Sequence, residues 1–193
     1  MPNASGDSPA SFPIEKLYAL YIAHPSVCTD TRKVKTNDLF FALKGDNYNG
    51  NLFSVNAIES GAAWAVIDEK PAILHERLIL VQDVLETLQA LAAHHRNQFQ
   101  IPFLAITGSN GKTTTKELLH AVLSKKYKTY TTEGNLNNHI GIPLTILKIK
   151  ADAEIAIIEM GAYQVGLLNS IAISQLFNAF CWHKWLIIFS ASL

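Results

Sequence analysis

Residues 103–119, FLAITGSNGKTTTKELL, constrain the fold more than any other stretch of the chain. The apolar run at 103–107 predicts a buried strand, and the pattern after Gly111 predicts an amphipathic helix. Glycine, lysine and hydroxyl residues fill the turn between them. Such a turn directs backbone N–H groups and the positive end of the helix dipole to one point. The stretch therefore predicts an anion site within α/β architecture.

The turn between that strand and helix has the composition of a phosphate-binding loop. Lys112 can reach the β and γ phosphates of ATP, which makes it the predicted catalytic residue, and the Thr113 hydroxyl can coordinate Mg²⁺. A plain helix-capping turn is the alternative, but the strand before the loop and the helix after it favour a nucleotide site. The predicted nucleotide-binding residues are Gly108, Ser109, Asn110, Gly111, Lys112, Thr113 and Thr114.

Apolar runs and helical patterns alternate from Leu39 onward, which is typical of α/β proteins. The expected strands lie at 39–45, 63–68, 77–83, 128–132 and 153–160, and a helix is expected at 51–62. We expect a loose tail at 1–13, one domain at 14–100 and a second at 101–193, because the segment NQFQIP interrupts the pattern near residue 100.

Two helices carry predicted core stripes. In the helix expected at 84–99, the apolar spacing predicts that His94 and His95 lie in solvent, and the alternative is a pair that binds a metal. The stripe of that helix consists of Val84, Leu85, Leu88, Leu91 and Ala92. The stripe of the helix after the loop consists of Leu118, Leu119, Val122 and Leu123.

Glu159 ends the apolar strand expected at 153–160, at the edge where parallel α/β sheets bind ligands. A carboxylate after an apolar run is costly to bury unless it meets a cation. Mg²⁺ held jointly by Thr113 and Glu159 is the predicted arrangement, and a glutamate that faces water is the alternative.

Residues 131–147, TTEGNLNNHIGIPLTIL, combine tight-turn residues with side-chain amides. Gly134, Asn135, Asn137 and Asn138 supply donors and acceptors that suit a polar ligand. An ordinary turn before a helix is the alternative, with Pro143 in the first helical turn.

Charge and composition exclude several classes of protein. Lysine plus arginine and aspartate plus glutamate number 16 each, so no overall field favours nucleic acid, and any anion site must be local. The apolar runs are too short to cross a membrane, no secretory signal is visible, and the two cysteines suit a reducing compartment. We expect a cytoplasmic protein that is a monomer if it folds.

The string TGSNGKTTT, with only two residues between its glycines, resembles the ATP loop of the Mur ligase family. These are ATP-dependent amide ligases of bacterial peptidoglycan precursor synthesis. EMGA resembles a string of the same family, and GNLNNHIGIP resembles the branch that adds D-alanyl-D-alanine to UDP-N-acetylmuramoyl-tripeptide. The resemblance implies a small N-terminal α/β UDP-binding domain followed by a P-loop-type α/β ATP-binding domain, with Asn137 and Asn138 near substrate and nucleotide, and Glu159 on Mg²⁺.

The segment TDTRKVKTNDLFFALKGDNYNG resembles the UDP-binding module of the same branch. Asn51 departs from the histidine common at its position. A surface turn with a solvated arginine is the alternative. The substrate-binding residues that the resemblance implies here are Thr31, Arg32, Lys44, Asn49 and Gly50, with Gly45 in the same turn.

The implied reaction is amide formation: ATP phosphorylates the tripeptide carboxylate, and the D-alanyl-D-alanine amine attacks the acyl phosphate. The resemblance ends near residue 172, and an apolar tail begins near 173, as a shifted reading frame would produce. His183 is the one candidate there for a further metal ligand. We therefore expect a truncated ligase with an incomplete ATP-binding domain that binds ligands without turnover. The alternatives are a sibling ligase that adds a diamino acid, a small-molecule kinase, and a binding or misfolded fragment.

Overall fold

The computed structural model describes residues 12–161 and 185–190. Most of the predicted tails at 1–13 and from about 173, as well as His183, lie outside these residues. The chain divides into two compact units, residues 1–88 and 89–193. This division falls within helix α3 (Val84–Arg96), and the domain boundary predicted after residue 100 stays a prediction.

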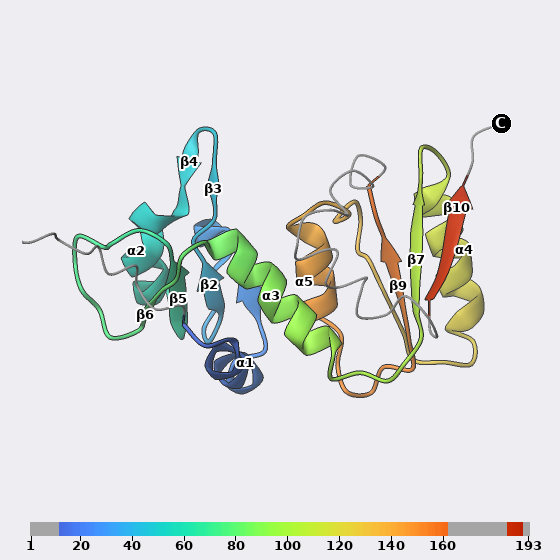
Figure 1. Ribbon diagram of the computed structural model, residues 1–193, viewed down its shortest axis with the longest axis horizontal. Coiled ribbons are helices and arrows are strands. Elements are labelled where there is room, and N and C mark those ends of the chain that lie inside the picture. Colours follow the sequence, from blue (N-terminus) through green and yellow to red (C-terminus); the bar gives the residue numbers. More distant parts are fainter. Residues whose placement is uncertain (1–11, 162–184, 191–193) are drawn as a thin grey trace, which may run out of the picture. The chain divides into compact units, whose positions relative to one another are not determined.

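Unit 1 contains a four-stranded parallel sheet in the order β1-β2-β5-β6 (Figure 1). All three residues of β2 are fully buried, because both faces of a parallel sheet are covered. The strands are β1 (Val27–Cys28), β2 (Leu39–Phe41), β5 (Trp64–Ile67) and β6 (Leu78–Leu80). The helices are α1 (Ile14–Ala23) and α2 (Ser54–Glu59), with 3-10 turns η1 (Thr31–Lys33) and η2 (Gly50–Phe53).

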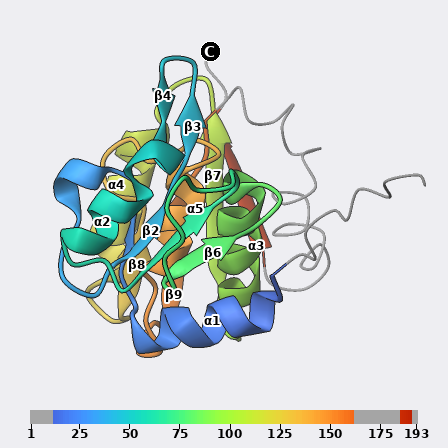
Figure 2. The ribbon, with the colours of Figure 1, turned by 90° about the vertical axis from the view of Figure 1, so that its left-hand side faces the viewer.

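The single strand predicted at 39–45 is wrong, because the chain bends after β2. Lys44–Gly45 forms β3, which pairs antiparallel with β4 (Tyr48–Asn49) as a hairpin that projects from unit 1 (Figures 1 and 2). Gly50 closes this bend, since its N–H donates to the carbonyl of Leu43 at 2.9 Å. A Cβ at Gly50 would lie 2.7 Å from that carbonyl oxygen, so the close approach requires glycine.

In helix α3, four of the five residues predicted in the core are buried, but the prediction that His95 lies in solvent is wrong. Val84, Leu88, Leu91 and Ala92 are buried, whereas Leu85 is half-buried. His95, predicted in solvent, is also buried, and its Nε2 lies 2.8 Å from the carbonyl oxygen of Ile149. The reason is helical spacing: position 95 is three and four residues after the last two apolar members, so it continues their face.

Unit 2 contains a second parallel sheet in the order β10-β7-β9-β8 (Figure 1). Strand β7 lies between β9 and β10, and α4 contacts β7, β8 and β9. The backbone of β10 pairs with β7 in the register Trp185 to Phe103. The strands are β7 (Phe103–Gly108), β8 (Thr129–Thr131), β9 (Ile155–Glu159) and β10 (Trp185–Ser190), and the helices are α4 (Lys112–Leu123) and α5 (Gly141–Leu147).

The predicted apolar stripe of α4 is half wrong. Leu118 and Val122 are 64% and 68% exposed, while Leu119 and Leu123 are half-buried. The fully buried residue of this helix is Lys116. Positions 116, 119 and 123 share one face at helical spacing, which turns Leu118 and Val122 to the opposite side.

Within residues 12–161, every helix is too short or too polar to cross a lipid bilayer.

Candidate functional site

The loop between β7 and α4 depends on two glycines. Gly108 has φ 141° and Gly111, the residue before α4, has φ 76°. Both angles lie where a side chain is strained, so the turn needs glycine at these two places. Ser109 and Asn110 are exposed between them. The loop therefore presents backbone to solvent at the N-terminus of a helix of 12 residues.

The first turn of α4 brings a lysine and a hydroxyl to this loop. The ammonium of Lys112 donates to the carbonyl oxygen of Gly108 at 2.7 Å and lies 3.3 Å from that of Ser109. The Thr113 hydroxyl lies 3.1 Å from Oε2 and 3.3 Å from Oε1 of Glu159, and Thr114 is exposed. The predicted lysine, threonine and strand-end glutamate are thus within one site.

Glu159 is 1% exposed, so the alternative of a glutamate in solvent is wrong. Its Oε1 accepts a hydrogen bond from Nδ2 of Asn137 at 2.8 Å, and its backbone N–H donates to the Thr132 hydroxyl at 2.9 Å. The carboxylate therefore joins β9, the segment after β8 and the first turn of α4. Buried carboxylates require such partners.

Lys116 completes this cluster and was missed from the sequence. Its ammonium lies 3.7 Å from Oε2 of Glu159 and donates to the carbonyl oxygen of Thr132 at 2.7 Å. One signal could have revealed it: Lys116 is four residues after Lys112 and therefore on the same side of the helix.

The two asparagines predicted together are used differently. Asn137 reaches Glu159, as described above. Asn138 instead accepts hydrogen bonds at Oδ1 from the N–H groups of Ile140 at 3.1 Å and Gly141 at 2.8 Å, where α5 begins. This is the capping role of an ordinary turn before a helix. The predicted substrate contact of Asn138 stays a prediction.

Thr31 and Arg32 lie in η1 of unit 1, next to Asp30. Two guanidinium nitrogens of Arg32 donate to the Asp30 carboxylate at 2.9 and 2.8 Å, and the arginine side chain is 85% exposed. These hydrogen bonds lower the pKa of Asp30 to about 2. The geometry is that of a surface turn with an arginine that is already paired with a carboxylate, and the substrate-binding role of Thr31 and Arg32 stays a prediction.

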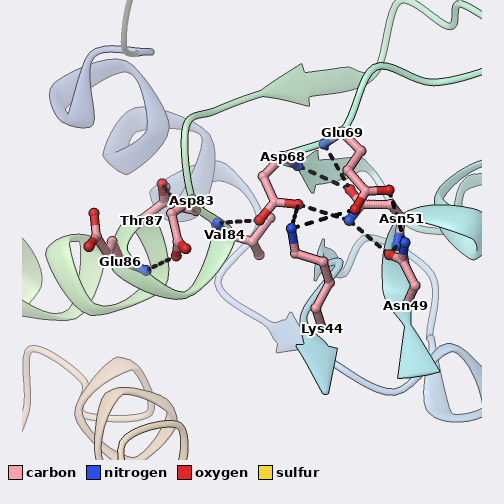
Figure 3. Close-up of polar contacts among 9 residues, drawn as sticks. All are labelled: Lys44, Asn49, Asn51, Asp68, Glu69, Asp83, Val84, Glu86 and Thr87. Carbon is pink, nitrogen blue, oxygen red and sulfur yellow. Dashed lines mark hydrogen bonds and ion pairs between the residues drawn. The ribbon is translucent and has the colours of Figure 1, made fainter. Parts of the chain in front are cut away.

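Lys44 belongs to a second polar cluster, on the hairpin side of unit 1 (Figure 3). Its ammonium lies 3.1 Å from Oδ1 of Asp68 and 3.5 Å from Oε1 of Glu69. The hydrogen bond to Asp68 raises the pKa of Lys44. The predicted residue Asn49 joins the cluster by donating to Oε2 of Glu69 at 2.9 Å, and Gly50 is buried next to it. One cation therefore faces two carboxylates.

Asn51 and Asp68 organise this cluster (Figure 3), and Asp68 was not predicted as a site residue. The Asn51 amide donates to Asn49 Oδ1 at 3.0 Å and to Asp68 Oδ1 at 2.9 Å, and its oxygen accepts from the Asp68 N–H at 3.0 Å. Oδ2 of Asp68 accepts from the N–H of Val84, where α3 begins, at 3.2 Å. Asp68 directly follows β5, as Glu159 ends β9, and this position was the available signal.

A pocket of about 380 Å³ adjoins the cluster within unit 1. This volume is within the range of small-molecule sites. Its lining includes Asn51, Leu52, Val55, Glu69, Lys70 and Ile73.

The chemistry available in unit 2 is anion binding and oxygen coordination. The loop offers backbone N–H groups and an ammonium, and Thr113 and Glu159 offer oxygen atoms of the kind that Mg²⁺ prefers. No group of three or more histidine, cysteine, aspartate or glutamate side chains that could hold a metal is present in residues 12–161.

A parallel sheet with a glycine–lysine–threonine loop between strand and helix, and a carboxylate at the end of the neighbouring strand of the sheet, is the arrangement typical of P-loop-type α/β proteins. Two family matches narrow this class. Residues 106–178 match the Mur ligase middle domain, and residues 25–96 match the Mur ligase family, catalytic domain. The chain belongs to the Mur ligase family.

Two curated relatives share the name of one branch of this family. The chain is 43% identical over 146 residues to the UDP-N-acetylmuramoyl-tripeptide–D-alanyl-D-alanine ligase of Bacillus subtilis (strain 168), covering 74% of this chain and 32% of that protein. It is 43% identical over 152 residues to the protein of the same name from Synechocystis, covering 76% and 34%. The chain thus spans about a third of the length of these relatives.

Solved structures agree with the fold. The MurF ligase of Thermotoga maritima, in complex with ADP, matches with a TM-score of 0.69 and 32% identity over 80% of this chain and 35% of that one. MurF from Acinetobacter baumannii matches with a TM-score of 0.66 and 36% identity over 71% and 30%. The α/β fold that the sequence predicted is confirmed, and the four-stranded sheet of each unit is parallel.

Proposed function

We propose that this chain binds ATP in unit 2 and a UDP-linked muramyl tripeptide in unit 1. These would be two steps of a ligase that adds D-alanyl-D-alanine in peptidoglycan synthesis. One observation carries the proposal. At the glycine loop before α4, the Lys112 ammonium contacts the loop backbone, and the Thr113 hydroxyl contacts the buried Glu159. The names of the relatives, and the ADP bound to the Thermotoga maritima protein, support the choice of ligands.

The proposed ATP site uses the loop from Gly108 to Thr114. Backbone N–H groups and the helix dipole would bind the phosphates, and the Lys112 ammonium would leave the loop carbonyls to contact the β and γ phosphates. Catalysis of this kind consists of positioning and of stabilising charge.

The oxygen atoms beside the loop fit a bound Mg²⁺. Thr113 and Glu159 would hold it, since a hydroxyl and a carboxylate within 3.1 Å of each other are hard donors for a hard cation. When bound, the ion would neutralise charge on the phosphates. Asn137 would orient the carboxylate through its hydrogen bond to Oε1.

The proposed precursor site is the polar cluster of unit 1 with its adjoining pocket. The side-chain amides of Asn49 and Asn51 and the pocket of about 380 Å³ suit a polar ligand of moderate size. Lys44 already faces two carboxylates, so its part would be to hold the hairpin rather than to supply positive charge to the diphosphate.

The reaction that we propose for ligases of this branch has two steps. The γ-phosphoryl group of ATP passes to the tripeptide carboxylate, which releases ADP. The D-alanyl-D-alanine amine then attacks the acyl phosphate and expels phosphate. The family assignment favours this class over a kinase. Absence of turnover by this chain alone, its cytoplasmic location and its monomeric state stay predictions.

Fluorescent ADP titrated into the purified chain tests the nucleotide site. K112M should weaken binding by about tenfold or more, because a charge-assisted contact to phosphate is lost. K126M, which removes a lysine from the turn after α4, is the matched control. Calorimetry with the UDP-linked tripeptide tests unit 1. Failure of the unmodified chain to bind either ligand would contradict the proposal.

A further inference from the structure

Lys116 is a buried cation in the helix that follows the loop. It is 0% exposed, and its ammonium donates to the carbonyl oxygen of Thr132 at 2.7 Å and lies 3.3 Å from that of Gly134. Two carbonyl oxygens do not compensate the cost of removing an ammonium from water. The buried position therefore requires a carboxylate nearby.

Two carboxylates are within ion-pair distance of Lys116, and they differ in burial. Oε1 of Glu117 lies 3.1 Å away, but that side chain is 60% exposed and screened by solvent. Oε2 of Glu159 lies 3.7 Å away, and both partners are buried. Among residues 12–161, Lys116 is the only cation paired with Glu159. The other groups that touch this carboxylate, Thr113 and Asn137, are neutral.

A fixed ammonium at this carboxylate acts oppositely on the two ligands of the proposed site. It repels a divalent cation at Glu159 and attracts the phosphates of a nucleotide, and burial keeps salt from screening either effect. At the same time it ties the turn that contains Gly134 to α4, so the segment that carries Asn137 is held in place.

We propose that Lys116 is a positioning residue and the built-in counter-cation of Glu159. It makes nucleotide binding less dependent on Mg²⁺ than Glu159 alone would make it. The inference rests on the proposed function, which supplies the nucleotide and assigns Glu159 and Thr113 to the metal.

K116Q and K116M test this role, with K128Q as the matched control. Glutamine keeps an N–H donor for Thr132 and removes the charge, and methionine removes both. Lys128 pairs with Asp152 at 3.7 Å on the surface, so K128Q makes the same change of charge away from the site. The affinity for fluorescent ADP is measured in EDTA and in saturating Mg²⁺. Binding of Mn²⁺ alone is measured by electron paramagnetic resonance.

In K116Q and K116M we expect ADP binding in EDTA to weaken. The ratio of ADP affinities with and without Mg²⁺ should rise by about tenfold, and Mn²⁺ alone should bind about tenfold more tightly. K128Q should leave the ratio and the Mn²⁺ affinity unchanged. A purely structural role would weaken ADP binding equally in both conditions and leave Mn²⁺ binding unchanged, and that result would overturn the inference.

Other outcomes separate the inference from the proposed function. Absence of ADP binding by the unmodified chain would refute the proposed function, whereas the Mn²⁺ affinities of the variants would still test the role of Lys116. Absence of Mn²⁺ binding by the unmodified chain and by both variants would overturn the inference. If the single variants do not melt cooperatively, the double variant K116Q/E159Q removes both charges. Recovery of a cooperative melt supports the counter-cation role, and no recovery overturns it.

Discussion

At the scale of single residues, two carboxylates at strand ends have the same kinds of partners. Asp68 and Glu159 each stand at the carboxyl end of a parallel strand, are almost fully buried, and bind both a lysine and an asparagine side chain. Each therefore connects segments that are far apart in the sequence. A buried carboxylate with such partners is costly to disturb, because the partners lose their charge compensation as well.

Asp68 provides a direct test of this view. D68N should lower the free energy of unfolding by about 2 kcal/mol, since the new amide group places N–H donors either against both Lys44 and Asn51 or against the N–H of Val84, while Glu69 alone remains as a carboxylate for the lysine. Urea denaturation followed by circular dichroism measures the change. D46N, in the exposed part of the same hairpin, is the control and should stay within about 0.5 kcal/mol of the unmodified chain. Equal stability of the two variants would contradict the role of Asp68.

At the scale of elements, helix α3 contains a titratable contact. The His95 Nε2 lies against the Ile149 carbonyl, and Gln89, earlier in the same helix, donates to the carbonyl of His139 at 3.0 Å. The two side chains therefore contact the chain before and after α5. Burial lowers the pKa of His95.

Because the folded state disfavours the protonated form of His95, stability should be fully present above the ordinary histidine pKa of about 6.5. It should fall as the pH drops from there toward the lowered pKa of the folded state, since the unfolded chain takes up the proton first. H95Q keeps an N–H donor for Ile149 and should flatten this dependence. Thermal melts from pH 7.5 to 5 measure it, with H120Q as the control. An unchanged slope in H95Q would exclude His95 as the cause.

The position of each element was easier to predict from the sequence than the side that it buries. The strand, loop and helix from Phe103 to Leu123 were predictable, because apolar runs and obligatory glycines are local signals. The orientation of α4 was not, since four apolar residues at 118, 119, 122 and 123 are compatible with either side of the helix. The sheet and the buried Lys116 decide which side is covered, and those contacts are distant in the sequence. Asp68 and His95 differ from Lys116, because each had a local signal: Asp68 directly follows an apolar strand, and position 95 continues the buried face of its helix.

At the scale of the whole molecule, the two compact units each contain a site of their own. Unit 1 has a core around Phe40, Ile58 and Ile67, with the Lys44 cluster at the edge of its sheet. Unit 2 has the glycine loop and Glu159 at the edge of another sheet. Sites on separate cores open and close locally, so a ligand protects amides chiefly in the unit that binds it.

Hydrogen exchange followed by mass spectrometry tests this separation on the intact chain. Mg²⁺ with ADP should slow exchange in peptides that contain residues 108–114 and 132–138, because the loop N–H groups would bind phosphate and the Asn137 segment would be held through Glu159. UDP should instead slow exchange at 44–51, where the hairpin meets Asp68 and Glu69. K112M is the control, since it should weaken the first pattern at the same ADP concentration and keep the second. Protection of residues 44–51 by ADP would show that the nucleotide acts on unit 1 as well, and the assignment of one ligand to each unit would be wrong.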